Sequence, residues 1–231
     1  ALKKSLTTEQ ICAHLQLKAN GQKNLKQNKI NKKFVYLISP DKIPNINFYN
    51  NLALVLSSKK ISFFQLRLKK ETNSNKLIIG KKIKKICNKY KVKFLINDDP
   101  LLAKKLNADG CHLGQKDMDL IKARKILKNK IIGVTCHNSI NLAKRAIKAG
   151  ADYLAFGAFY TSKTKIVKYR ASLTVLKSIK KITSLPIVAI GGIKLSNYKK
   201  LLLNKANFLA ISGYIWNNKR YKPLEAIRKL K

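Results

Sequence analysis

Eight short runs rich in β-branched and aromatic residues recur along this chain, and stretches with helical spacing separate them. Strands that alternate with helices predict an α/β fold with a parallel sheet. Eight such strands are the number in a single (β/α)8 TIM barrel, which is the predicted fold. An open doubly wound sheet is the alternative, but no G-x-G-x-x-G motif follows the first run. The predicted strands are residues 34–38, 61–67, 93–97, 110–114, 131–135, 153–157, 186–190 and 207–212.

One domain, residues 34–231, is predicted to follow an N-terminal extension, residues 1–33. The length of 231 residues suits either one barrel or two small domains, and one domain is the simpler interpretation. Thr7 and Gln10 have the spacing of a capping box, which is compatible with a short helix within the extension. The segment 18–33 is polar, basic and nearly free of large apolar residues, so we expect a flexible linker.

The formal net charge of +40 raises the question of a nucleic-acid partner. Only six of the 50 basic residues are arginine, although arginine is favoured for bidentate contacts with phosphates and bases. The lysines are spread through nearly every segment, which indicates a compositional bias rather than a binding patch. We therefore expect no specific nucleic-acid partner. A non-catalytic basic nucleic-acid-binding protein is the alternative class of function.

The sequence carries no sign of a membrane or secretory role. No apolar run approaches the roughly 18 residues needed to cross a bilayer, and the N-terminus lacks the apolar core of a signal peptide. The four cysteines are far apart with no C-x-x-C pair, which argues against a zinc knuckle or a redox pair. We expect reduced, buried thiols in a cytoplasmic protein without a membrane partner. Nothing in the sequence indicates an oligomeric state.

Half of the ten acidic residues lie in one window, residues 95–119. Active sites of barrels lie at the carboxyl ends of the strands, and Asp98 and Asp117 come at the ends of the third and fourth predicted strands. Magnesium takes one or two carboxylates and completes its shell with water and phosphate oxygens, so this pair predicts a Mg²⁺ site. The other carboxylates of the window are expected to be turn or helix-start residues: Asp99, Asp109 and Asp119.

Three basic residues stand at strand ends around the predicted metal: Arg67, Lys69 and Lys165. Cations that converge on a metal-binding pair of carboxylates imply a polyphosphate between them. His112 and His137 also lie at strand ends. A lone histidine in such a place is more often a hydrogen-bonded wall of the pocket than a ligand or base, so neither is given a catalytic role.

Glycines end the last two predicted strands, at Gly191-Gly192 and at Ile211-Ser212-Gly213. Glycine lets backbone N–H groups approach an anion closely, and the loops after these two strands are the usual phosphate site of this fold. We therefore predict a phosphate site here, with tight turns alone as the alternative.

Several motifs in a fixed order carry a resemblance to a known family. They are QLRLK 65–69, ND 97–98, GQKD 114–117, GVTCH 133–137, SKTK 162–165, IGGI 190–193 and IS 211–212. Over about residues 34–216 the chain resembles the thiamine phosphate synthases of the thiamine phosphate synthase and thiazole tautomerase superfamily. The resemblance implies a transferase that uses Mg²⁺ to join 4-amino-2-methyl-5-(diphosphooxymethyl)pyrimidine to thiazole phosphate. The products would be thiamine phosphate and pyrophosphate.

The resemblance also implies which residues bind each group. The pyrimidine pyrophosphate would be held by Gln65, Arg67, Lys69, Asn97, Thr135 and Lys165. The thiazole phosphate would be held by Ser162, Thr164, Gly192, Ile211 and Ser212. The metal ligands would be Asp98 and Asp117. The catalytic residues would be the cations that neutralise the leaving pyrophosphate, namely Arg67, Lys69 and Lys165. The implied chemistry is departure of pyrophosphate and capture of the resulting carbocation by the thiazole nitrogen, so no general base is needed.

The chain departs from the family pattern at two places. Thr135 stands where the family usually has serine, which keeps the hydroxyl. Thr161-Ser162 stands where the family has Pro-Thr, and the glycine expected later in this loop is absent from YRASL, residues 169–173. The alternative within the superfamily is a thiazole tautomerase, an isomerase. Tautomerases tend to lose the metal aspartates and the T-x-T-K pattern, so the retention of Asp117, Thr164 and Lys165 argues against that alternative.

Overall fold

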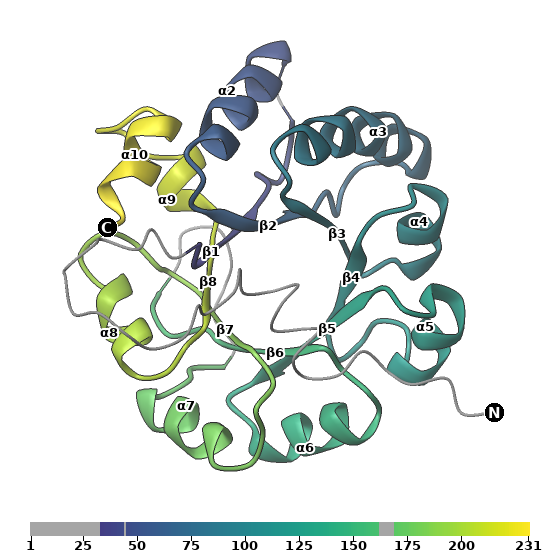
Figure 1. Cartoon of the computed structure of the whole chain (residues 1–231), viewed down its shortest axis with the longest axis vertical. Helices are drawn as coiled ribbons and strands as arrows, with labels where there is room; N and C mark the ends of the chain where they lie inside the picture. The colour runs from purple at the N-terminus through teal and green to yellow at the C-terminus, as the bar shows by residue number, and fades with distance from the viewer. Residues whose placement is uncertain (1–32, 44, 162–168) are drawn as a thin grey trace, which may run out of the picture.

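The computed structural model describes residues 33–43, 45–161 and 169–231 (Figure 1). Eight parallel strands close into a barrel in chain order, and the first strand also pairs with the last. The predicted (β/α)8 barrel is therefore confirmed. The strands are β1 Val35–Ile38, β2 Ile61–Leu66, β3 Lys93–Asn97, β4 Gly110–Leu113, β5 Ile131–His137, β6 Tyr153–Gly157, β7 Ile187–Ile190 and β8 Phe208–Ile211.

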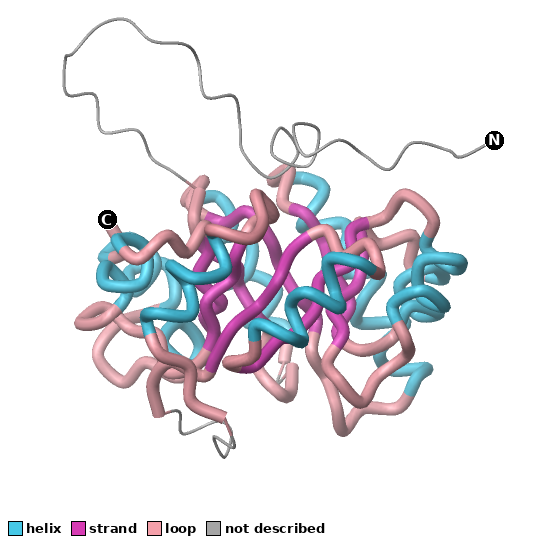
Figure 2. The backbone as a smooth tube through the Cα atoms, turned by 90° about the horizontal axis from the view of Figure 1, so that it is seen from below, coloured by secondary structure: helices cyan, strands magenta, loops and turns pink. Residues whose placement is uncertain are grey.

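Helices form a ring around the barrel in Figure 1, and the view in Figure 2 shows the strands running between them. Most of these helices connect consecutive strands, which gives the parallel crossovers of this fold. The helices are α2 Ile46–Ser57, α3 Asn73–Lys89, α4 Pro100–Lys105, α5 Leu120–Leu127, α6 Ile140–Lys148, α7 Leu173–Lys180, α8 Tyr198–Leu203, α9 Gly213–Trp216 and α10 Pro223–Lys229.

Two carboxylates of the acidic window start helices, as predicted. Asp99 caps α4 because its Oδ1 accepts a hydrogen bond from the backbone N–H of Leu102 at 2.9 Å. Asp119 caps α5 in the same way, through the N–H of Ile121 at 2.9 Å. Asp109 lies in the turn before β4 and accepts from the N–H of Phe94 at 2.9 Å. Each of these three carboxylates therefore accepts a hydrogen bond from a backbone N–H.

Two apolar layers hold the barrel together. Alternate strand residues point inward, and Tyr36, Phe63, Tyr153 and Phe208 fill the interior; the rings of Phe63 and Phe208 meet edge to face at 5.2 Å. The remaining strand positions pack outward against the helices in a larger layer. Inward side chains near the carboxyl ends of the strands therefore reach the rim where barrels bind ligands.

The start of the barrel domain stays a prediction, because residues 1–32 lie outside the described residues. Contacts with the barrel are present from Lys33, whose carbonyl oxygen accepts from the Ser62 hydroxyl at 2.6 Å. The next residue, Phe34, stacks on Tyr198 with 5.9 Å between ring centroids. The chain therefore belongs to the packed domain from residue 33 at the latest.

Two further expectations can be compared with the described part of the chain. In those residues no helix is both long enough and apolar enough to span a bilayer. Cys87, Cys111 and Cys136 are free and buried, as expected, and burial raises the pKa of each thiol. Cys12 lies outside the described residues.

Candidate active site

A pair of carboxyl groups lies at the rim formed by the carboxyl ends of β3 and β4. Asp98 follows the last residue of β3 and has a left-handed backbone, with φ of 64°. Asp117 lies in the turn after β4, where its Oδ2 accepts from the N–H of Gly114 at 2.6 Å. The side chains of Asp98 and Asp117 are hydrogen-bonded to each other. The sequence prediction that these two acids face the same rim is met by this geometry.

The two carboxyl groups have pKa values shifted in opposite directions. Burial acts to raise the pKa of Asp98, but the hydrogen bond with Asp117 and the Lys69 ammonium outweigh it and hold that pKa below its ordinary value. Burial raises the pKa of Asp117, and its hydrogen bond to the Asp98 carboxylate adds to the effect. As the pH rises, Asp98 therefore loses its proton before Asp117 does.

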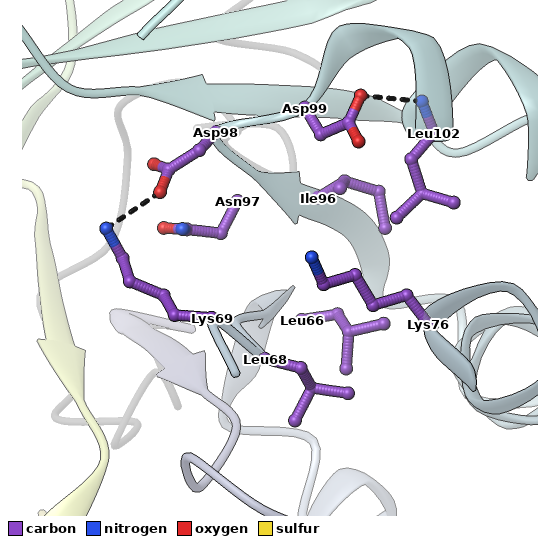
Figure 3. Close-up of a pocket in the computed structure, with 9 residues that line it drawn as sticks. All are labelled: Leu66, Leu68, Lys69, Lys76, Ile96, Asn97, Asp98, Asp99 and Leu102. Atoms are coloured by element: carbon purple, nitrogen blue, oxygen red, sulfur yellow. Dashed lines mark hydrogen bonds and ion pairs between the residues drawn. The ribbon is translucent and has the colours of Figure 1, made fainter. Parts of the chain in front are cut away.

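Lys69 forms an ion pair with this pair of carboxyl groups, through Asp98. Its Nζ lies 2.9 Å from Oδ2 of Asp98 (Figure 3). Beside the two groups is a cavity of about 210 Å³ at the ends of β2 and β3. Figure 3 shows Lys76 reaching toward the same cavity from α3. The cavity is lined by Leu66, Leu68, Lys69, Lys76, Ile96, Asn97, Asp98, Asp99 and Leu102.

Arg67 forms its ion pair with a different carboxylate, that of Asp41. It lies one residue beyond β2, and its Nη1 pairs with Oδ1 of Asp41 at 2.5 Å. Its backbone N–H donates to the hydroxyl of Ser39 at 2.9 Å, which ties the loop after β1 to the loop after β2. Of the predicted catalytic cations, the structure therefore brings Lys69 to the acids and pairs Arg67 with another carboxylate. Lys165 lies outside the described residues.

Gln65 carries an unpaired polar group toward the end of β2. Its side chain is 2% exposed, and its amide Nε2 has no hydrogen-bond partner among the described residues. A buried amide N–H without a partner costs stability, and a bound ligand that accepts its hydrogen bond would remove that cost. Asn97 is the last residue of β3, the strand that pairs with β2, and it lines the cavity.

A row of hydrogen bonds ends at Thr135 on β5. The Oγ1 of Thr135 lies 2.8 Å from Nε2 of His112, and Nδ1 of His112 lies 2.8 Å from the hydroxyl of Tyr153. The Tyr153 hydroxyl in turn lies 2.8 Å from that of Tyr36. Burial lowers the pKa of His112 to about 4, so the ring is neutral near pH 7. The sequence prediction that His112 is a hydrogen-bonded wall residue agrees with this geometry.

The predicted thiazole phosphate residues are only partly described. Gly192 follows β7 with φ of 60°, and a Cβ there would lie 2.3 Å from the carbonyl oxygen of Thr161. Ile211 ends β8, and the hydroxyl of Ser212 donates to the carbonyl oxygen of Ser39 at 3.1 Å. Ser162 and Thr164 lie outside the described residues.

The loop that contains those two residues is anchored on both sides by described contacts. The N–H of Ala158 donates to the carbonyl oxygen of Tyr169 at 3.0 Å, and the N–H of Ala171 donates back to Ala158 at 3.0 Å. The ring of Tyr169 packs against that of His137, with 4.3 Å between centroids. The loop therefore leaves and returns beside the end of β6.

Sequence reasoning missed several residues of this rim. Asp41, the partner of Arg67, and Lys76 of α3 follow no pattern that places them there. Tyr36 and Tyr153 had a usable signal, because both occupy inward positions of predicted strands and a buried tyrosine hydroxyl requires a partner. His112 lies at a third inward position, one strand before Thr135.

Comparison with known proteins decides the family. A family model described as thiamine monophosphate synthase matches residues 35–215. The chain belongs to this family. It is 93% identical over 207 residues to the thiamine-phosphate synthase of Pelagibacter ubique strain HTCC1062, an alignment that covers 90% of this chain and all of the relative. It is 39% identical over 184 residues to the thiamine-phosphate synthase of Nitrosomonas eutropha, covering 79% of this chain and 86% of the relative.

A solved structure agrees with this membership of the thiamine monophosphate synthase family. The thiamine phosphate pyrophosphorylase of Pyrococcus furiosus superposes with a TM-score of 0.75 at 26% sequence identity. The superposition covers 87% of this chain and 95% of that one. The family predicted from the order of the motifs is therefore confirmed.

The donor set at the rim of this family member fits a hard divalent cation. Among the described residues there is no group of three or more His, Cys, Asp and Glu side chains that could hold a metal. Two neighbouring carboxyl groups are nevertheless present, and both must be deprotonated to act together as metal ligands. Magnesium commonly uses one or two carboxylates and takes its remaining ligands from water and substrate phosphates. Asp98 and Asp117 therefore match magnesium better than a transition metal, which would favour imidazole or thiolate ligands.

Proposed function

We propose that this chain is a thiamine-phosphate synthase. It joins 4-amino-2-methyl-5-(diphosphooxymethyl)pyrimidine to thiazole phosphate and releases pyrophosphate. The observation that carries the proposal is the cluster of Asp98, Asp117 and Lys69 at the carboxyl ends of neighbouring strands. The unpaired amide of Gln65 lies toward the end of β2, the strand that precedes Lys69. Two carboxylates that can hold a metal, a lysine ammonium and an amide N–H without a partner together suit the binding of a polyphosphate. The names of the curated relatives support the same activity.

The pyrophosphate of the pyrimidine substrate is proposed to bind between the ends of β2, β3 and β5. Lys69 and the amide of Gln65 donate to its oxygens, and Asn97 and the Thr135 hydroxyl approach it from the neighbouring strands. Arg67 and Lys165 complete the set of donors. Mg²⁺ held by Asp98 and Asp117 would neutralise charge on the pyrophosphate oxygens.

The chemical step needs charge neutralisation and alignment. The bond between the pyrimidine methylene carbon and the pyrophosphate oxygen breaks, and the electron pair leaves with pyrophosphate. The lone pair of the thiazole nitrogen then forms the new bond to the methylene carbon, and no proton is transferred. Lys69 stabilises the developing negative charge on the leaving group, because its ammonium is already positioned at this rim. This agrees with the state of His112, which is a poor general base because its pKa is about 4 and both of its ring nitrogens are hydrogen-bonded.

The thiazole phosphate is proposed to bind at the opposite side of the rim. Gly192 and Ile211-Ser212 supply backbone N–H groups after β7 and β8, and Ser162 and Thr164 supply hydroxyls from the loop after β6. Two anion sites on one rim hold the reacting atoms in line, which lowers the entropic part of the barrier. The substrates are thus small molecules, and the proposed location is the cytoplasm.

The test supplies the purified protein with both phosphorylated precursors and Mg²⁺ and identifies the product. Formation of thiamine phosphate is expected. Isomerisation of a thiazole carboxylate phosphate without thiamine phosphate formation would instead identify a tautomerase. Tight RNA or DNA binding that survives physiological salt, without turnover, would identify a nucleic-acid-binding protein.

A further inference from the structure

Four side chains form an unbroken line of hydrogen bonds from the barrel interior to the rim. Tyr36 on β1, Tyr153 on β6, His112 on β4 and Thr135 on β5 are joined by three contacts of 2.8 Å each. The first three side chains are nearly inaccessible, with exposed fractions of 2%, 1% and 8%. Thr135 is half-buried and stands at the carboxyl end of its strand. The line therefore connects the dry interior with the proposed pyrophosphate site.

The direction of these hydrogen bonds follows from counting protons. A neutral imidazole has one N–H and one acceptor nitrogen, so the line can run in only two ways. If Nδ1 of His112 carries the proton, it donates to Tyr153, and the single contact between the Tyr153 and Tyr36 hydroxyls can hold only one of their two protons. The other hydroxyl proton then has no acceptor among the described residues. A buried hydroxyl proton without an acceptor is costly, so this direction is disfavoured.

The opposite direction satisfies every buried group. Tyr36 donates to Tyr153, Tyr153 donates to Nδ1 of His112, and Nε2–H of His112 donates to Oγ1 of Thr135. The hydroxyl proton of Thr135 is then free of the line and turns to the rim. No other acceptor for it is found among the described residues.

We propose that Tyr36 and Tyr153 fix His112 as its Nε2–H tautomer, and that this directs the Thr135 hydroxyl to donate its proton to an anionic oxygen bound at the rim. The proposal rests on the proposed function only for the identity of that anion as pyrophosphate. Tyr153 and His112 are positioning residues, because they act through Thr135. Direction matters here, since a threonine that gave its proton to His112 would present lone pairs to the anion.

Two contacts hold Tyr153 and His112 in this arrangement. Gly133 of β5 lies against the Tyr153 ring, and a Cβ at Gly133 would lie 1.8 Å from the ring carbon that bears the hydroxyl. A glycine is therefore required for Tyr153 to reach His112. Both ring nitrogens of His112 are also hydrogen-bonded, one to Tyr153 and one to Thr135, so the orientation of the ring is fixed from both sides.

The tautomer can be read directly by NMR of protein labelled with ¹⁵N-histidine, without substrate. The chain has three histidines, and a His112→Asn variant assigns the signals of residue 112. The expected spectrum shows a protonated Nε2 and an unprotonated Nδ1. A protonated Nδ1, or a charged ring at pH 7, would overturn the proposal whether or not the protein turns over its precursors.

Binding of inorganic pyrophosphate with Mg²⁺ tests the consequence. Tyr153→Phe removes the donor that fixes the tautomer and should weaken pyrophosphate binding about tenfold, the order expected for one hydrogen bond to a charged group. The matched control is Tyr198→Phe, which also removes a buried hydroxyl but one bonded to the carbonyl oxygen of Lys231 at 2.6 Å, away from this line. It should leave the dissociation constant unchanged.

A double-mutant cycle separates positioning from general stability. If Tyr153 acts through the Thr135 hydroxyl, Tyr153→Phe should weaken binding in the wild-type background and have no further effect in a Thr135→Val background. Equal weakening in both backgrounds, or equal weakening by Tyr198→Phe, would contradict the proposal.

Discussion

Asp98 and Asp117 are the two residues that we propose as protein ligands of the metal. Their side chains are hydrogen-bonded, and the Asp98 carboxylate already has Lys69 as a counterion. Removal of one carboxylate should therefore affect metal and substrate binding more than folding, because both groups lie at a rim rather than in the apolar core. Asp117 is the less buried of these two side chains.

Asp117→Asn should lower turnover about a hundredfold or more and leave the melting temperature nearly unchanged. Asparagine can still accept the hydrogen bond that Gly114 N–H donates at 2.6 Å, so the turn should survive. Steady-state rates in saturating Mg²⁺ and a thermal melt provide the two readouts. The matched control is Asp119→Asn, because asparagine caps a helix as well as aspartate and Asp119 only caps α5. Near wild-type turnover of Asp117→Asn would remove this residue from the site.

The buried ring of His112 predicts how stability depends on pH. Its pKa falls from 6.5 in the unfolded chain to about 4 in the fold because of burial. Between these values the unfolded state binds more protons, so the free energy of unfolding decreases as the pH falls from 6.5 toward 4. The contribution is fully present above 6.5, and about 2 kcal/mol of it is lost by pH 5.

Urea unfolding at pH 7 and pH 5 measures this loss, and His112→Asn serves as the reference because it lacks the titrating ring. The wild-type protein should lose about 2 kcal/mol more than the variant between these two pH values. An equal loss in both proteins would show that His112 does not carry the pH dependence.

The sequence predicts some contacts between individual side chains and cannot predict others. Asp98 and Asp117 could be placed together because consecutive parallel strands bring their carboxyl ends to the same edge. The pairing of Arg67 with Asp41 could not be predicted, since Asp41 lies in a loop and no periodicity relates a loop residue to a strand end. The hydrogen-bonded line through His112 depends on side-chain directions inside the barrel, which become definite only with the strand register.

At the scale of elements, the strands were predicted more closely than their ends. Residues 93–97 and 153–157 match β3 and β6, because runs of β-branched and aromatic residues bounded by turns define buried strands well. β5 extends two residues beyond its predicted end, to His137, where a register shift against β6 lets pairing continue. Such an irregularity depends on the neighbouring strand and has no local sequence signal.

The backbone after β7 packs closely against Thr161, which follows β6, and Gly192 leaves no room there for a side chain. A Cβ there would lie 2.3 Å from the carbonyl oxygen of Thr161, and the backbone has φ of 60°. Gly192→Ala should therefore destabilise the fold by about 2 kcal/mol or more through strain and displacement of this segment. Because Gly192 is proposed to bind the thiazole phosphate, the KM for that substrate should rise as well.

Gly150→Ala is the matched control for this prediction. Gly150 also has a left-handed backbone, with φ of 86°, but a Cβ there would meet nothing within 4 Å. Its replacement should cost about 1 kcal/mol by strain alone and leave the KM for thiazole phosphate unchanged. If both variants change KM equally, the close approach of Gly192 to Thr161 does not shape the phosphate site.

In the molecule as a whole, the contacts at the start of the barrel predict where the catalytic domain begins. Described contacts begin at Lys33, through the Ser62 hydroxyl, and Phe34 stacks on Tyr198. A truncated chain that starts at Lys32 keeps both contacts, so it should be active with an unchanged melting temperature. Activity assays and thermal melts of the truncated and full chains compare the two. A large drop in melting temperature would show that earlier residues are part of the fold and that the predicted boundary at residue 34 is wrong.

We propose that the rim with Asp98, Asp117 and Lys69 catalyses Mg²⁺-dependent departure of pyrophosphate with capture of the pyrimidine by thiazole phosphate. The most direct measurement is pyrophosphate release by the full chain supplied with both precursors, with Mg²⁺ present or chelated. We expect one pyrophosphate per thiamine phosphate formed, with release that stops on chelation and is severely reduced in Asp117→Asn. Absence of pyrophosphate release in saturating Mg²⁺, or release that neither chelation nor Asp117→Asn affects, would contradict it.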